Sequence, residues 1–356
     1  MKAAIVVPTA RPASVLDFLT AWEQQFSGHD IIIIEDNPTR TLDLASRTTE
    51  HYSWKEIDQE LQDNSWIIPR RTDCIRSFGF YKASQKSVDI VVSLDDDCFP
   101  TGDDFLLKHW ERLSEPAHSP AWTSTLATAV PRGVPYFTTN RRAECVLNHG
   151  LWTNIPDYDA LTQISITRYP FDPTPLYQVI PQGKYFPMCG MNIAFRPAIM
   201  PIMYFLLMGR DCPYDRFGDI WCGVIAKRIC DHLGYAVRSG DPLVDHRRAS
   251  NVWKNLMKEA PGYEMNELLW KEVDSAILTE TSFSGCYRAI ARQVALLGGY
   301  WAKAAAAMGM WADLVSSVER NSNVTDDQNL AQKGDCDLNK IQLTSFSHRP
   351  DVVPYR

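Results

Sequence analysis

The amino-acid sequence predicts an α/β fold in which helices pack against a parallel sheet. Residues 3–8 and 31–34 are apolar runs of strand length, and the large apolar residues between them recur at helical spacing. A third apolar run at 90–94 follows a helical pattern over 76–87. Strands that alternate with helices are typical of a parallel sheet, whose ligands bind at the C-terminal ends of the strands.

The rest of the chain has a less regular pattern. Residues 132–196 are rich in aromatic residues, proline and glycine, and we expect them to form loops that build a substrate pocket over the sheet. An apolar helical pattern follows within 213–230, and 243–246 reads as a short strand. Residues 289–315 are apolar but are interrupted by charged residues and glycines, so they predict a packed helical region.

Composition argues against several classes of partner and location. The 356 residues include 36 Lys and Arg against 43 Asp and Glu, so no basic excess exists to bind a nucleic-acid backbone. The N-terminal apolar run is too short for a signal peptide, and no apolar stretch is long enough to span a bilayer. Nine cysteines are scattered without a Cys-x-x-Cys pair, which is typical of reduced thiols. We therefore expect a cytoplasmic protein without a nucleic-acid partner or a membrane span.

Three consecutive carboxylates, Asp95, Asp96 and Asp97, directly follow the third predicted strand. Adjacent carboxylates repel one another unless a cation or hydrogen-bond donors compensate them. A solvated turn is one interpretation, but the apolar strand before the triplet and Cys98-Phe99-Pro100 after it favour a binding site. Asp95 and Asp97 project to the same side of an extended segment, so one can contact a ribose and the other a metal ion.

The sequence lacks the two common glycine-rich phosphate loops. Neither G-x-G-x-x-G after the first strand nor G-x-x-x-x-G-K-[ST] is present, which disfavours flavin, nicotinamide and P-loop chemistry. A divalent cation bound by carboxylates is the alternative way to hold a diphosphate. The acidic triplet therefore predicts a metal-dependent site for a diphosphate ligand.

Several stretches of the sequence resemble the reversibly glycosylated polypeptides, a family also called UDP-arabinopyranose mutases. The longest specific string is Phe-Pro-Met-Cys-Gly-Met-Asn at 186–192, and Ser-Leu-Asp-Asp-Asp-Cys-Phe at 93–99 contains the acidic triplet. The other matching stretches, in order, are residues 5–9, 132–135, 149–152, 154–160, 203–205, 219–221, 230–234 and 246–251. The resemblance extends over residues 4–295.

The resemblance implies a GT-A-like fold of the nucleotide-diphospho-sugar transferase type, with a mixed, mostly parallel sheet flanked by helices. It implies an enzyme that interconverts a UDP-pyranose, with UDP-arabinose as the expected UDP-sugar, and its furanose form, using Mn²⁺ or Mg²⁺ and no flavin. The nucleotide-sugar domain would cover 1–295, followed by a helical segment at 296–320 and a polar tail at 321–356 that is either flexible or a partner-binding arm. Members of the family tend to form homo-oligomers.

The resemblance also assigns catalytic residues. Arg132 matches the Arg to which the family attaches a sugar, and Arg141 or Arg142 is nearest to a second functional Arg. The family tends to carry two acids before a Trp. Here Gly218 stands in place of one of them and only Asp219 remains, as a candidate base or hydroxyl-orienting group.

Metal and substrate residues are expected on the same basis. GT-A sites often add a His to their acidic metal motif, so Asp97 and His246 are the expected metal ligands. Asp36 follows the second predicted strand and is therefore placed to meet a ligand. The expected substrate-binding residues are Pro8, Thr9, Asp36, Arg76, Asp95, Asp96, His149, Trp152, Asp157 and Asn192.

Other interpretations stay open. Arg132 lies between Pro131 and Gly133 and fits a simple turn, and His149 fits a structural imidazole. Trp152 and Trp221 fit core positions as well as sugar-stacking platforms, and the same holds for Tyr158. The rival functions are a metal-dependent glycosyltransferase with an external acceptor and a non-catalytic subunit that binds a nucleotide sugar.

Overall fold

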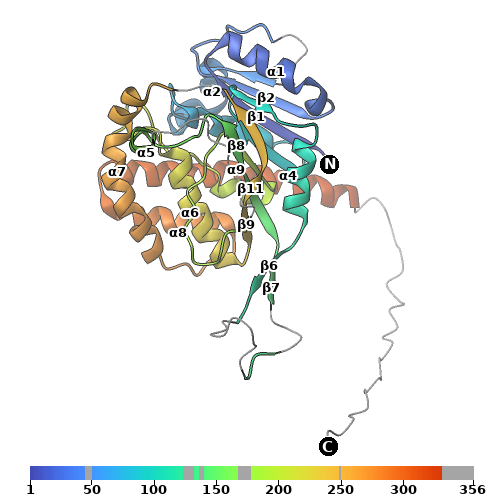
Figure 1. Ribbon diagram of the computed structural model, residues 1–356, viewed down its shortest axis with the longest axis vertical. Helices are drawn as coiled ribbons and strands as arrows, with labels where there is room; N and C mark the ends of the chain where they lie inside the picture. Colours follow the sequence, from blue (N-terminus) through green and yellow to red (C-terminus); the bar gives the residue numbers. More distant parts are fainter. Residues whose placement is uncertain (45–49, 123–131, 136–139, 167–177, 248–249, 331–356) are drawn as a thin grey trace, which may run out of the picture. The chain divides into compact units, whose positions relative to one another are not determined.

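The computed structural model describes residues 1–44, 50–122, 132–135, 140–166, 178–247 and 250–330, with side chains described as far as residue 316 (Figure 1). Contacts divide the chain into two units, Met1–Val318 and Glu319–Arg356. Of the second unit the structure describes only helical backbone as far as Leu330. Arg248 and Ala249 of the matching stretches, and residues 331–356 of the expected tail, lie outside the described residues.

A nine-stranded mixed sheet forms the centre of the first unit. Its order is β3 (Glu50–Tyr52), β2 (Asp30–Glu35), β1 (Ala3–Thr9), β4 (Ile90–Leu94), β10 (Asn192–Phe195), β8 (Cys145–Asn154), β11 (Ala236–His246) and β5 (Cys98–Pro100), with β9 (Gln178–Val179) paired to β11. Strands β5, β9 and β10 run against the direction that the other strands share. The predicted α/β class with a mixed, mostly parallel sheet is confirmed, as are the strands predicted at 3–8, 31–34 and 90–94.

Helices cover both faces of this sheet (Figure 1). They are α1 (Pro12–Phe26), α2 (Trp54–Leu61), α3 (Arg76–Ser84), α4 (Phe105–Ser114), α5 (Ala160–Ser165), α6 (Gly218–Leu233), α7 (Val252–Ser275), α8 (Phe283–Val294) and α9 (Tyr300–Leu330), with short 3-10 turns η2 (Gln62–Ile67), η3 (Asp73–Ile75), η4 (Pro197–Ile202) and η5 (Ala295–Leu297). A separate two-stranded ribbon, β6 (Ala117–Pro120) and β7 (Asn140–Ala143), projects from the sheet.

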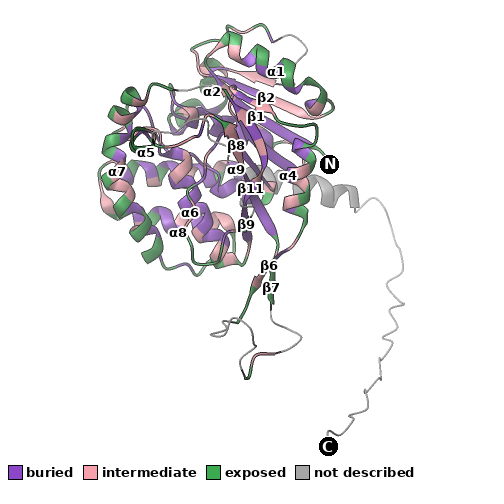
Figure 2. Cartoon of the chain, viewed as in Figure 1, coloured by how far each residue is buried: buried purple, intermediate pink, exposed green. Residues whose placement is uncertain are grey.

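The alternation of side chains along the strands creates two hydrophobic cores. In β1, Ala4 and Val6 face the core that also contains buried residues of α3, α6, α8 and α9. Ala3, Ile5 and Val7 face the opposite core, which α1 and α4 cover. Because both faces are buried, the strand is a continuous apolar run and stands out in the sequence (Figure 2).

Two elements differ from the predictions at their ends. Strand β11 begins at Ala236, whereas the sequence predicted a strand only from residue 243. The pairing with β8 shifts register between Gly240 and Leu243, and the glycine and proline in this stretch resemble a turn in the sequence. Helix α3 ends at Ser84, three residues earlier than the apolar pattern suggests.

Helix α9 completes the first core. Trp301, Ala304, Met308, Trp311 and Val315 are buried and recur on one face of the helix. The packed helical region predicted at 289–315 is therefore confirmed, and the first unit extends to Val318. In the described residues, no helix has the length and apolar character needed to cross a membrane.

Candidate active site

The three carboxylates after β4 have three different environments. Asp96 is buried, and its carboxylate accepts hydrogen bonds from the Thr9 hydroxyl and from Arg11. The Asp96 carbonyl oxygen accepts from the Ser14 hydroxyl at 3.0 Å. Asp96 and Thr9, both expected to bind substrate, thus join the ends of β1 and β4 to the start of α1.

Asp95 is bound by a buried Arg. Arg76 is 1% exposed and donates to Asp95, to Ser93 Oγ at 2.7 Å and to the Gly190 carbonyl oxygen at 2.6 Å. Burial opposes the charge of Arg76, but the carboxylates of Asp95 and Asp73 outweigh it and raise its pKa. Arg76 therefore stays protonated and ties the end of β4 to the loop before β10.

Asp97 and His246, the expected metal ligands, lie close to each other. Asp97 Oδ1 is buried and has no hydrogen-bond partner in the described residues, and it lies 3.9 Å from His246 Nε2. His246 Nδ1 is 2.8 Å from the Ile155 carbonyl oxygen and donates to it, which leaves Nε2 as the ring nitrogen nearest to Asp97. Burial, and then the charge of Asp95, raise the pKa of Asp97 to about 6, and a cation would reverse this effect.

A divalent cation suits this pair, but the pair alone does not complete its coordination. Within the described chain, no three His, Cys, Asp or Glu side chains cluster closely enough to hold a metal ion. Asp97 and His246 would therefore supply two ligands, and diphosphate oxygens and water would have to supply the others. Arg11, which also donates to Asp97 Oδ2 at 3.3 Å, adds positive charge beside the same carboxylates.

A polar cavity of about 390 Å³ opens beside Asp95. Of the expected site residues, it is lined by Arg76, Asp95, His149, Trp152, Asp157 and Asp219. Its wall also contains residues that the sequence analysis did not assign, among them Arg71, Asp73, Cys189, Arg216, Lys258 and Glu259. Segments far apart in the sequence thus meet in one acid-rich hollow.

Asp219 lies in this cavity, in the first turn of α6. Its Oδ2 accepts from the Gly190 amide at 2.9 Å. Burial, and then the nearby charge of Asp73, raise the pKa of Asp219 to about 7. A carboxyl group that titrates near neutral pH is suited to proton transfer.

Steric crowding explains why residue 218, just before Asp219, is a glycine. A Cβ on Gly218 would lie 2.3 Å from both Cys74 Sγ and the Phe205 carbonyl oxygen. This backbone therefore leaves no room for an acidic side chain at position 218.

Asp157 and His149 meet at the loop before β10. The Cys189 thiol donates to Asp157 Oδ2 at 2.7 Å, and burial raises the pKa of Asp157. His149 Nε2 accepts from the Cys189 amide at 3.1 Å, and Nδ1 is 3.0 Å from Ser239 Oγ. Both ring nitrogens of His149 therefore have hydrogen-bond partners, and burial lowers its pKa to about 4. These contacts agree with the interpretation of His149 as a structural imidazole.

The aromatic residues separate into core and cavity positions. Trp221 is fully buried, so it occupies a core position and not that of a sugar-stacking platform. Trp152 and Tyr158 line the cavity with their rings edge to face at 6.4 Å. The buried Trp152 Nε1 has no hydrogen-bond partner in the described residues and could donate to a ligand.

Five expected substrate-binding residues lie outside the cavity lining: Thr9 and Asp96, described above, and Asn192, Asp36 and Pro8. Asn192 is buried and donates to the Leu151 and Pro242 carbonyl oxygens, so its amide joins strands. Asp36 accepts from Trp54 Nε1 at 2.7 Å and from the Arg71 amide at 2.9 Å, and thereby positions a cavity residue. Pro8 is half-buried within β1.

The expected catalytic arginines also lie outside the cavity lining. Arg132 is exposed in a turn before Gly133, whose φ is +95°. Arg141 lies in β7, donates to Gln182 Oε1 at 3.1 Å and, with Arg142, lines a separate cavity of about 520 Å³ under the β6–β7 ribbon. The structure therefore does not bring these arginines together with Asp95 or Asp219.

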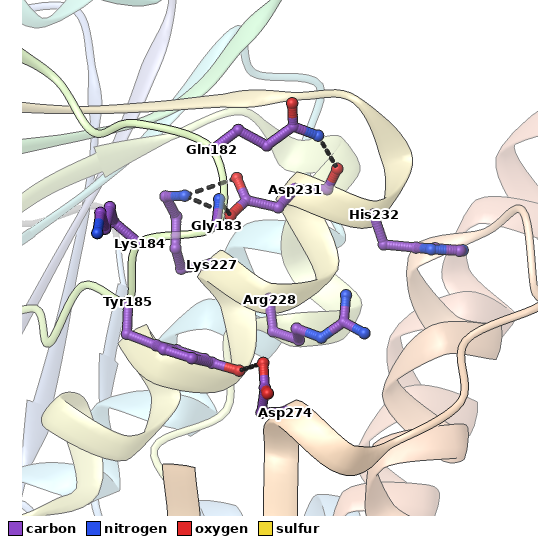
Figure 3. A pocket seen from close by; sticks show the side chains of 9 residues that line it. All are labelled: Gln182, Gly183, Lys184, Tyr185, Lys227, Arg228, Asp231, His232 and Asp274. Carbon is purple, nitrogen blue, oxygen red and sulfur yellow. Dashed lines mark hydrogen bonds and ion pairs between the residues drawn. The ribbon is translucent and has the colours of Figure 1, made fainter. Parts of the chain in front are cut away.

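A third hollow, of about 340 Å³, contains none of the expected residues (Figure 3). Lys227 and the Gly183 amide both point at the Asp231 carboxylate, with Lys227 Nζ 2.6 Å from each oxygen (Figure 3). Tyr185 donates to Asp274 at 2.8 Å. Because its buried cation is neutralised by its own carboxylate, this hollow offers weaker chemistry than the cavity beside Asp95.

The solved structures that align with this chain are distant from it. A mannosyltransferase from Pyrobaculum calidifontis, in complex with GDP-Man and Mn²⁺, aligns with a TM-score of 0.41 and 11% identity over 93% of this chain and 80% of that one. Glucosyl-3-phosphoglycerate synthase from Mycobacterium tuberculosis, with Mn²⁺ and UDP-glucose, aligns with a TM-score of 0.38 and 12% identity over 75% and 78% of the two chains.

Sequence relatives are much closer. A probable UDP-arabinopyranose mutase 1 from Pisum sativum is 35% identical over 345 residues, which cover 90% of this chain and 92% of the relative. UDP-arabinopyranose mutase 1 from Oryza sativa is 35% identical over 87% of this chain and 89% of the relative. The model of the reversibly glycosylated polypeptides matches residues 2–320. The chain therefore belongs to the reversibly glycosylated polypeptide family.

Proposed function

We propose that this chain is a metal-dependent mutase that interconverts the pyranose and furanose forms of a UDP-pentose, with UDP-arabinose as the first substrate to test. Family membership supports the reaction class, since relatives at 35% identity are named UDP-arabinopyranose mutases. The observation that carries the proposal is the pair Asp97 and His246: Asp97 Oδ1 has no hydrogen-bond partner in the described residues and lies 3.9 Å from His246 Nε2. The neighbouring carboxylate of the same triplet, Asp95, lines the cavity.

The proposed reaction sets clear chemical requirements. The bond from C1 to the diphosphate must break, and the sugar's O4 must bond to C1. The diphosphate must then return to C1 as the bond from C1 to O5 breaks. A divalent cation held by Asp97 and His246 would neutralise the diphosphate and make it a better leaving group.

The chain's own residues supply the remaining steps. Asp219, with a pKa near 7, accepts the O4 proton and returns it to O5, so that protons balance over the cycle. Arg76 fixes the Asp95 carboxylate at the cavity wall, where it can accept from a ligand hydroxyl. Trp152 and Tyr158 offer ring surface to the sugar.

Incubation of the protein with UDP-arabinopyranose and Mn²⁺, a quench with EDTA and chromatography of the nucleotide sugars test this proposal. The mutase predicts a furanose product of unchanged mass, little free UDP and no need for an acceptor. Release of UDP with sugar transfer to an added acceptor would favour the glycosyltransferase alternative. Unchanged substrate with measurable binding would favour the non-catalytic subunit.

The same assay tests the cofactor. Turnover should stop in EDTA and return with Mn²⁺ or Mg²⁺, and purified protein should hold no flavin. A cytoplasmic location, self-association and a partner-binding role for residues 321–356 stay predictions from the sequence.

A further inference from the structure

Arg216 has an unusual backbone in the wall of the cavity. Its φ is +65°, in the left-handed region that a residue with a bulky side chain occupies at a cost on the order of 1–3 kcal/mol. The Arg216 amide donates to Asp215 Oδ1 at 3.0 Å, which helps to hold this conformation. Strain of this kind persists where the surrounding structure enforces it, and it is concentrated at functional sites.

The Arg216 side chain is held at one end only. Its Nε donates to Glu259 Oε1 at 2.8 Å. Glu259 is buried and also accepts from the Ala160 amide at 2.7 Å and from the Tyr263 hydroxyl at 2.8 Å, so the carboxylate is fixed by three donors. The side chain is 35% exposed, and among the described residues its two terminal nitrogens donate to no protein group. A rigidly held guanidinium therefore has two free donors at the cavity.

The other cavity cations are less available than Arg216. Arg76 is saturated by Asp95, Ser93, Gly190 and the Asp73 carbonyl oxygen. Lys258 Nζ pairs with Asp215 at 2.9 Å.

A further cation of the cavity wall, Arg71, is directed over the Trp54 ring at 5.6 Å. Arg216 instead interacts electrostatically with Asp157, and Asp157 interacts in the same way with His246. Asp157 is therefore within electrostatic range of both the guanidinium and the expected metal ligand His246.

We infer that Arg216 binds the sugar-bearing phosphate of the nucleotide diphosphate, an inference that rests on the proposed function. Two parallel N–H donors match two phosphate oxygens, which a single ammonium does not. When the bond from C1 to the phosphate oxygen breaks, its electron pair moves onto that phosphate. Arg216 stabilises the added negative charge there.

Titration calorimetry with UDP and with UMP, in the presence of Mn²⁺, tests this contact. In Arg216→Gln the affinity for UDP should fall roughly ten- to hundred-fold, because two charge-assisted hydrogen bonds are lost. The affinity for UMP, which lacks the second phosphate, should stay within about two-fold of the unmodified protein. Arg216→Lys keeps the charge and the partner Glu259 but loses the fork, and should give an intermediate loss for UDP. It also serves if the Gln variant does not fold.

Arg288→Gln is the matched control. Arg288 pairs with Asp313 and its side chain is 34% exposed, close to the 35% of Arg216, but it lies on α8 outside the cavity lining. Its loss removes the same charge and should leave UDP affinity unchanged.

The outcomes separate this inference from the proposed function. Unchanged UDP affinity in both Arg216 variants, or an equal loss for UDP and UMP, overturns the role of Arg216 and leaves the mutase proposal standing. A selective loss for UDP in a protein that does not isomerise UDP-arabinose supports Arg216 and rejects the mutase. A protein that binds no UDP rejects both.

Discussion

The adjacent carboxylates Asp96 and Asp97 differ in the number of protein hydrogen-bond donors that contact them. Asp96 is compensated by protein donors, Thr9 and Arg11, and so contributes to the fold. Asp97 has an oxygen without a partner in the described residues and faces a His nitrogen 3.9 Å away. Arg11 reaches only the other Asp97 oxygen, at 3.3 Å, so the charge is compensated in part. A buried charge of this kind is costly to folding and is therefore a sign of a ligand.

This contrast predicts opposite effects of two similar substitutions. Asp97→Asn should lower turnover roughly 100- to 1,000-fold, since the metal ion loses an anionic ligand. The unfolding temperature of the metal-free protein should stay the same or rise, because a buried charge that is only partly compensated is removed. Asp96→Asn should lower the free energy of unfolding by about 2 kcal/mol through its weakened bonds to Thr9 and Arg11. Thermal unfolding and turnover of both variants check this, and equal loss of stability in the two would contradict the division of roles.

Arg132 offers a second test at the level of one residue. If this chain attaches a sugar to itself as the family resemblance implies, the exposed Arg132 is the expected acceptor, and Arg132→Ala should remove the pentose adduct from the intact mass. A guanidinium stays protonated and is a poor nucleophile, so the reaction needs a donor activated at the metal site. The adduct should therefore also disappear in Asp97→Asn. A pentose that persists in Arg132→Ala would move the site, with Arg141 and Arg142 next.

At the scale of an element, the start of α6 determines where Asp219 lies. Gly218→Ala would place a Cβ 2.3 Å from the Phe205 carbonyl oxygen, and backbone atoms cannot move aside as a flexible side chain can. We expect a loss of roughly 2–4 kcal/mol in the free energy of unfolding, from overpacking and a displaced helix end. Gly309→Ala in α9 is the control, since nothing lies within 4 Å of its added Cβ. It should stabilise the protein by up to about 1 kcal/mol through helix propensity. Chemical unfolding of both variants measures this, and equal effects would refute the steric argument.

The elements that the sequence predicts well are those buried on both faces. Strands β1, β2 and β4 are continuous apolar runs because each face meets a core. The first half of β11 escapes prediction, since Gly240 and Pro242 look like a turn while the backbone continues after a register shift. Such a shift depends on pairing with β8, which no local pattern encodes.

Prediction of the site is limited for a related reason. Asp95, Asp97 and Asp219 stand out through strand ends and motif strings, and their neighbourhood in space follows from the sheet order. Arg11 and Arg216 do not stand out, because the carboxylate that each Arg meets is 85 and 43 residues away in the sequence. The positive φ of Arg216 and its contact with Glu259 are consequences of tertiary packing.

Across the whole molecule, buried ionisable groups give opposing dependences of stability on pH. His109 accepts from the Asn148 amide at Nδ1 and is 3.1 Å from Asn192 Oδ1 through Nε2, and burial lowers its pKa to about 3. Burial likewise lowers the pKa of His149 to about 4, while it raises that of Asp219 to about 7. The two histidines stabilise the fold fully only above pH 6.5, and Asp219 costs least at low pH. Because the two histidines are opposed by two carboxyl groups, Asp219 and Asp97, whose pKa burial raises to about 6, the stability of the unmodified protein should change little between about pH 4 and 6.

A variant of His109 separates the two contributions. Below its ordinary pKa of 6.5 the unfolded chain takes up a proton at His109 and the folded chain does not until about pH 3, so stability is lost as the pH falls through this window. His109→Gln removes that loss and can still hydrogen-bond to Asn148 and Asn192. The free energy of unfolding of His109→Gln, relative to that of the unmodified protein, should therefore rise by about 1.4 kcal/mol for each unit that the pH falls from about 6 to 4. Urea unfolding at a series of pH values measures it, with His118→Gln on the exposed β6 position as the control. Parallel curves for His109→Gln and the unmodified protein would show that His109 is protonated in the fold, and the neutral hydrogen-bonded link between α4, β8 and β10 would then be wrong.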